Sequence, residues 1–173
     1  MQIFSDFSLL PFELKGSIYA IGNFDGLHFG HRSVIESARK ISIGRAVPLG
    51  LLTFDPHPRE FFRPNDPSFR LTPKQIKLSI LEKWKIDFVM NIPFNQKLSE
   101  TEASDFMSKY LLNQLSVGGV VVGHDFAFGK NRKGDINMLR NFSKENNFEL
   151  VVVEPQLSSS GSLYSSRSIR ELI

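Results

Sequence analysis

The sequence predicts an α/β fold in which a parallel sheet of about five strands carries helices on both faces. Short apolar runs alternate with longer segments of helical spacing along the whole chain, which favours this class. The 173 residues, of which 41% are hydrophobic, suffice to bury one sizeable core. We therefore expect a single domain that occupies residues 1–173.

The strands are predicted from apolar, β-branched runs of roughly four to eight residues that Gly, Pro or Asn bounds. These runs occupy residues 17–22, 47–54, 87–92, 117–123 and 149–154. Such runs are typical of parallel strands that helices cover on both faces of the sheet.

Helices are predicted between the strands, where apolar residues recur at helical spacing. They occupy residues 31–41, 73–84, 101–115, 136–146 and 166–173. Thr72 before Pro73 predicts an N-cap with proline at the first helical position. The spacing of Ser99 and Glu102 predicts a capping box. The alternation implies right-handed crossovers in a Rossmann-like sheet, where ligands bind beyond the carboxyl ends of the strands.

The composition excludes several classes of protein. The chain has no cysteine, so disulfides, thiolate metal sites and cysteine nucleophiles are excluded. No apolar run approaches the ~20 residues that span a bilayer, and residues 1–15 lack the pattern of a signal peptide. We expect a cytoplasmic protein without a membrane partner. A net charge of +3 favours anionic ligands only mildly.

The segment Gly-Asn-Phe-Asp-Gly-Leu-His-Phe-Gly-His at residues 22–31 follows the first predicted strand. His28 and His31 flank Gly30 at a predicted helix start, where free N–H groups and the helix dipole favour an anion. Gly30 allows close approach of a phosphate, to which both imidazoles can donate hydrogen bonds. Spacing alone also fits a pair that only caps the helix. A zinc site would need a third ligand at motif spacing.

Three further segments lie at the ends of predicted strands or at the start of the last helix. They are Thr-Phe-Asp-Pro-His-Pro at 53–58, Gly-His-Asp-Phe-Ala-Phe-Gly at 123–129 and Tyr-Ser-Ser-Arg-Ser-Ile-Arg at 164–170. With residues 22–31 they resemble, in order, the motifs of the FMN adenylyltransferase module of bacterial FAD synthetases, in the nucleotidyltransferase superfamily. The resemblance covers residues 18–170 and implies a Rossmann-like nucleotidyltransferase domain.

The resemblance implies that ATP and FMN are converted to FAD and pyrophosphate, with Mg²⁺ accompanying ATP. In that family a riboflavin kinase domain usually follows this module. We expect residues 1–173 to lack it, although a longer parent chain could carry it.

The resemblance also implies site residues. The catalytic candidates are His28, His31 and Arg170. The ATP-binding candidates are Gly22, Asn23, Phe24, Asp25, Gly30, Asp125, Ser165 and Ser166. The flavin-binding candidates are Pro56, His57, Pro58, Phe62, Phe126 and Phe128.

Several assignments have a structural alternative. Asp25 and Asp55 are candidate magnesium ligands, yet aspartates at such positions also form turns. Phe126 and Phe128 alternate as core-facing residues do. Arg167 stands where the family has Ser or Thr, which puts one hydroxyl contact in doubt.

Three other functions compete with FMN adenylylation. The His-x-Gly-His element also suits transfer to another phosphorylated small molecule, such as phosphopantetheine or nicotinate mononucleotide. The departure at Arg167 fits a degenerate module that binds flavin or nucleotide without turnover. Aromatic and basic residues at 54–70 and 130–133 could bind nucleic acid, but the small net charge argues against that partner.

Overall fold

The structure is a computed structural model that describes residues 1–66, 70–159, 161 and 163–171. Residues 67–69 of the aromatic segment and the last two residues of the predicted terminal helix, 172–173, lie outside the described residues. The strands are β1 (Gln2–Phe4), β2 (Ile18–Ile21), β3 (Leu49–Asp55), β4 (Phe88–Pro93), β5 (Gly119–Gly123) and β6 (Glu149–Val153). The α-helices are α1 (Phe29–Arg45), α2 (Pro58–Phe62), α3 (Lys74–Lys83), α4 (Gln96–Ser99), α5 (Ala103–Asp105), α6 (Ile136–Glu145) and α7 (Ser166–Arg170). Three short 3₁₀-helices are η1 (Phe7–Leu9), η2 (Phe12–Leu14) and η4 (Lys130–Arg132), and η3 (Phe106–Gln114) is a π-helix.

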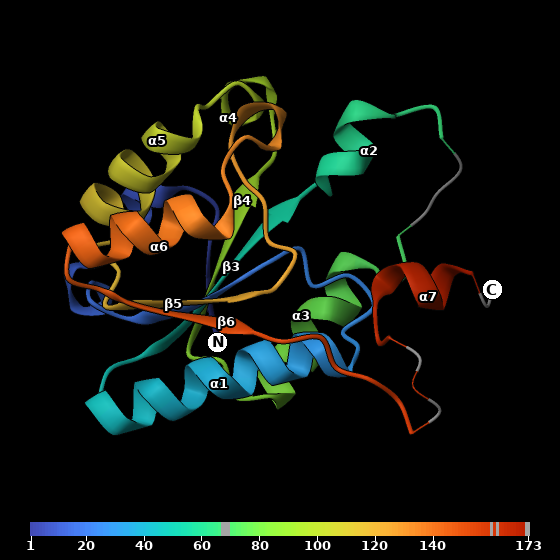
Figure 1. The fold of residues 1–173 in the computed structure, drawn as a ribbon, viewed down its shortest axis with the longest axis horizontal. Helices are drawn as coiled ribbons and strands as arrows, with labels where there is room; N and C mark the ends of the chain where they lie inside the picture. The colour runs from blue at the N-terminus through green and yellow to red at the C-terminus, as the bar shows by residue number, and fades with distance from the viewer. Residues whose placement is uncertain (67–69, 160, 162, 172–173) are drawn as a thin grey trace.

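The described strands form a six-stranded, all-parallel sheet in the order β1-β4-β3-β2-β5-β6 (Figure 1). The predicted fold class is confirmed, and the predicted strands correspond to β2 through β6. The additional edge strand β1 is three residues long and largely exposed, so it lacks the apolar run that revealed the others. Chain order reverses at β2, between β3 and β5, which makes this the topological switch point.

Side chains that alternate along each strand pack into two cores. Ile18 and Ala20 of β2 face the core under α1 and α3, whereas Tyr19 and Ile21 face the core under α5, η3 and α6. Figure 1 shows the same layers, with α1 and α3 on one face of the sheet and α5 and α6 on the other. Among the described residues, every helix is too short or too polar to traverse a bilayer.

Both predicted caps are wrong. Pro73, rather than Thr72, is the N-cap of α3, and the Thr72 hydroxyl instead accepts the Gly26 N–H at 3.2 Å. Ser99 ends α4, so it cannot cap the next helix. Glu102 is the N-cap of α5 and makes no side-chain capping bond. The predicted helix at 101–115 consists of α5 followed by the π-helix η3.

Candidate active site

A cavity of about 1070 Å³ opens at the carboxyl ends of the strands, around the switch point. It is lined by the loops after β2, β3, β5 and β6 and by α7, so all four motif segments meet there although they are far apart in the chain. The predicted site residues that line it are Gly22, Asn23, Phe24, Asp25, His28, Gly30, His31, His57, Pro58, Phe62, Asp125, Phe126, Phe128, Ser165, Ser166 and Arg170. Pro56 is not among the lining residues.

His28 and His31 lie at the start of α1 with their rings stacked, the centroids 3.7 Å apart. His28 is the N-cap of α1, and its Nδ1 accepts the His31 N–H at 3.4 Å. The proton of neutral His28 therefore lies on Nε2, which can donate to a ligand. At Gly30 an added Cβ would lie 3.0 Å from the His28 ring and 3.3 Å from the Tyr164 carbonyl, so glycine permits this close packing.

His31 is neutral at physiological pH. Burial, followed by the charges of His28 and Lys77, lowers the pKa of His31 to about 3. Its ring lies against Phe24, with centroids 5.3 Å apart, and its buried Nδ1 has no partner among the described residues. His31 can therefore offer a hydrogen bond to an anion but not a positive charge.

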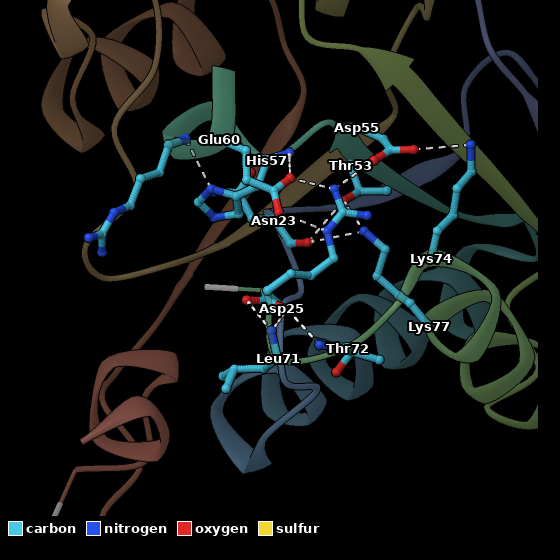
Figure 2. Close-up of polar contacts among 12 residues, drawn as sticks. Asn23, Asp25, Thr53, Asp55, His57, Glu60, Leu71, Thr72, Lys74 and Lys77 are labelled. Atoms are coloured by element: carbon cyan, nitrogen blue, oxygen red, sulfur yellow. Dashed lines mark hydrogen bonds and ion pairs between the residues drawn. The ribbon is translucent and has the colours of Figure 1, made fainter. Parts of the chain in front are cut away.

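His57 is the N-cap of α2, where its Nδ1 accepts the Arg59 N–H at 3.1 Å. Glu60 completes a capping box by accepting the His57 N–H at 3.2 Å (Figure 2). The pKa of His57 is lowered to about 4, and burial is the largest cause. His57 is thus a second neutral imidazole at the cavity wall, with its tautomer set by the backbone.

Asp25 joins segments that are distant in the sequence. Its buried carboxylate accepts the N–H groups of Leu71 and Thr72, each at 3.0 Å, and pairs with Arg170 of α7 (Figure 2 shows the first two contacts). The Ser166 hydroxyl donates to the Asp25 carbonyl at 2.6 Å. The chain's own donors therefore occupy the Asp25 carboxylate, and Asp25 holds α7 against the cavity.

The Asp55 carboxylate is occupied as well. It pairs with Arg70 and Lys74, each at 3.0 Å, and Arg70 also pairs with Glu60. Burial alone would raise the pKa of Asp55, but hydrogen bonds from Lys74 and Arg70 outweigh burial and hold it below its ordinary value. Neither Asp25 nor Asp55 fits a magnesium ion in this arrangement. No group of three or more acidic or histidine residues in the described part of the chain could hold a metal ion.

Aromatic side chains form part of the cavity wall. Phe126 stacks on Phe128, with centroids 5.5 Å apart. Phe128 is buried, and its ring centroid lies 5.6 Å from that of Phe106. Phe128 therefore belongs to the hydrophobic core as well as to the cavity wall. Phe62 is 63% exposed and packs edge-on against Phe94, which sequence reasoning did not select. Phe94 follows β4 directly, and its position at a strand end was the available signal.

Arginines from several loops add charge to the cavity. Arg59, Arg63 and Arg132 line it and were not predicted as site residues, although the first two lie within five residues of the end of the 53–58 motif. The Arg167 side chain is 88% exposed and pairs with Glu171 at 2.9 Å, so it is directed largely to solvent. The Ser165 hydroxyl caps α7 by accepting the Ser168 N–H at 3.0 Å.

Comparison with known proteins assigns the chain to a family. A family model described as FAD synthetase matches residues 11–167. The chain belongs to the FAD synthetase family. The resemblance of the motifs is thereby confirmed.

Curated relatives of this FAD synthetase domain are described as bifunctional riboflavin kinase/FMN adenylyltransferases. The protein of Haemophilus influenzae is 35% identical over 160 residues, which cover 92% of this chain and 52% of that protein. The protein of Buchnera aphidicola subsp. Schizaphis graminum is 32% identical over 159 residues, which cover 92% of this chain and 51% of that protein. The chain spans about half the length of the curated relatives it matches.

Solved structures share the fold of this FAD synthetase domain. A crystal structure described as a macrolide-efflux protein from Streptococcus pneumoniae has a TM-score of 0.82 at 20% identity and covers 99% of this chain and 56% of its own. The pantoate-beta-alanine ligase of Francisella tularensis has a TM-score of 0.63 at 17% identity, and the match covers 98% of this chain and 72% of the ligase chain. At these identities the likeness concerns the fold alone.

Proposed function

We propose that this chain transfers the adenylyl group of ATP to FMN, giving FAD and pyrophosphate. The observation that carries the proposal is the cavity at the switch point, where the four motif segments of an FAD synthetase domain meet around the start of α1. ATP and FMN are its proposed small-molecule partners. In a longer parent chain, a riboflavin kinase domain of the kind named in the relatives would supply FMN.

The reaction needs no protein nucleophile. The FMN phosphate attacks the α-phosphorus of ATP, and pyrophosphate leaves on the opposite side. The protein therefore orients the phosphates and stabilises charge on their oxygens. The Nε2–H of His28, the neutral His31 and the N–H groups at the start of α1 would donate to these oxygens. Arg170, fixed by Asp25, would supply permanent charge beside the leaving group.

The flavin would lie on the aromatic side of the cavity. Phe62 and Phe126 offer ring faces of the kind that suit a flat heterocycle. His57 and Pro58 lie on the same wall at the start of α2. Pro56, which does not line the cavity, would act by shaping the turn that places His57 there.

The test is chromatographic detection of FAD after incubation of the protein with FMN, ATP and Mg²⁺. His31→Ala should lose roughly 100-fold or more of the rate, because it removes a donor aimed at developing charge. Lys40→Ala, an exposed change on the same helix, should leave the rate unchanged. The proposal fails if the folded wild-type protein makes no FAD. Exchange of pyrophosphate into ATP with another phosphorylated acceptor would then favour a different nucleotidyl transfer.

A further inference from the structure

Lys77 is a buried lysine of α3 that the proposed reaction does not use directly. The residue is 8% exposed. Its Nζ donates to the Asn23 carbonyl at 3.3 Å and to the Thr53 hydroxyl at 3.2 Å, and Thr53 donates to the same carbonyl at 3.1 Å (Figure 2). Burial of an ammonium group costs free energy, so a lysine buried in this way must offset that cost by its contacts or by a function.

The two donors hold the peptide group between Asn23 and Phe24. In a planar trans peptide the carbonyl and the following N–H point in opposite directions. Because the Asn23 carbonyl faces Lys77, the Phe24 N–H points away from Lys77. Within the described part of the chain no acceptor bonds this N–H. Asn23 and Phe24 both line the cavity.

The backbone of Phe24 needs such support. Its φ of 51° lies in the left-handed region, which a bulky residue seldom adopts. A strained conformation of this kind persists only where its surroundings determine it. The buried Phe24 ring packs against His31, and the carbonyl before it is held by Lys77 and Thr53. Contacts therefore fix both the side chain of Phe24 and the peptide that precedes it.

We propose that Lys77 is a positioning residue of the cavity, which holds the Asn23 carbonyl so that the Phe24 N–H is presented to a phosphate group of the nucleotide. The ammonium also places a positive charge next to Asn23, which lines the cavity. The identity of the nucleotide rests on the proposed function. The role of Lys77 requires only that the cavity binds a phosphate anion.

The charge on Lys77 can be titrated in the neutral to alkaline range. The charged or titratable groups that face it are Asp25 and Asp55, whose charges raise its pKa, Arg70 and Lys74, whose charges lower it, and the imidazoles of His31 and His57. Burial is the largest influence and lowers the pKa of Lys77 to about 8. The anion affinity of the cavity should therefore decline as the pH rises through this value.

The experiment compares Lys77→Met and Thr53→Val with Lys83→Met. The last variant makes the same chemical change at an exposed lysine of the same helix, outside the cavity. Calorimetry measures ATP and pyrophosphate affinity from pH 6.5 to 9.5, and FAD formation gives kcat/KM over the same range. Circular dichroism and thermal melting show which variants are folded at the assay temperature.

Lys77→Met should weaken ATP and pyrophosphate binding at least tenfold at pH 7 and remove the alkaline decline seen in the wild type. Thr53→Val should weaken binding about threefold and keep the decline, because the ammonium remains. Lys83→Met should match the wild type. Unchanged affinity and an unchanged pH profile in folded Lys77→Met would overturn the proposal. If that variant does not fold, unchanged affinity in Thr53→Val overturns it.

The two proposals fail in different ways. If the wild type binds ATP but makes no FAD, the proposed function is wrong, and the binding data still decide the role of Lys77. If FAD forms normally in folded Lys77→Met, FMN adenylylation stands and the positioning role is wrong.

Discussion

Neutral imidazoles, rather than imidazolium cations, face the cavity at physiological pH. Burial lowers the pKa of His31 to about 3 and that of His57 to about 4. Backbone N–H groups bond the Nδ1 atoms of His28 and His57, which leaves Nε2–H as the donor on each ring. Positive charge comes instead from arginines such as Arg170. Neutral hydrogen-bond donors and positive charge are thus supplied by different side chains.

The neutral state of His31 predicts a loss of stability in mild acid. Below its ordinary pKa of 6.5, only the unfolded chain takes up this proton, so the free energy of unfolding falls as the pH decreases from 6.5 toward about 3. For His31 alone the fall between pH 7 and pH 5 amounts to about 2 kcal/mol. Urea denaturation at both pH values should show a smaller fall in His31→Gln. An equal fall in that variant and the wild type would contradict a neutral, buried His31.

At the scale of elements, the space around a glycine differs between the sheet and the helix α1. Gly50 of β3 lies under the rings of Phe88 and Tyr19, where an added Cβ would approach to 2.5 Å and 3.0 Å. Gly44, near the end of α1, has no atom within 4 Å of such a Cβ. Replacement of glycine by alanine should therefore change the free energy of unfolding in opposite directions at these two positions.

Gly50→Ala should lower the free energy of unfolding by about 1–3 kcal/mol, because the aromatic rings must shift. Gly44→Ala should raise it by about 0.5–1 kcal/mol, because alanine is the better helix former and meets no neighbour. Urea denaturation with matched slopes measures both. A stabilising Gly50→Ala would show that the sheet and its aromatic layer are packed more loosely than described.

At the scale of the whole molecule, the parallel sheet brings three of the four motif segments to one edge, and Asp25 then ties three of the surrounding segments together. Asp25 follows β2, Leu71 and Thr72 precede α3, and Arg170 belongs to α7. In Figure 1, α7 lies next to α3 at the carboxyl edge of the sheet. Its position depends on these contacts.

Asp25→Ala should lower the free energy of unfolding by about 3–5 kcal/mol, because it leaves buried donors and a charge without their partner. It should also speed tryptic cleavage at the arginines of α7. Asp125→Ala, which removes an exposed carboxylate from the same cavity, should change stability by less than about 0.5 kcal/mol. Equal stability of Asp25→Ala and the wild type would mean that α7 is held by other contacts.

The sequence by itself determined the class of fold, the strands β2 to β6 and the edge of the sheet where the cavity opens. These features follow from local patterns, since apolar runs mark buried strands and parallel strands share one carboxyl edge. The candidate residues lie in the four motifs or, for Phe62, in the loop after the second predicted strand, and all except Pro56 line the cavity. The short edge strand β1 left no comparable pattern.

Only the tertiary structure decided how these side chains are used. The Asp25 carboxylate is occupied by Arg170, which is 145 residues away, and the hydroxyl predicted to cap α3 serves the Gly26 N–H instead. The charge of His31 depends on burial, and Lys77 donates a hydrogen bond to a carbonyl 54 residues earlier. A short sequence window contains neither the solvent exposure of a group nor its distant partners, and these two quantities set its protonation and its hydrogen bonds.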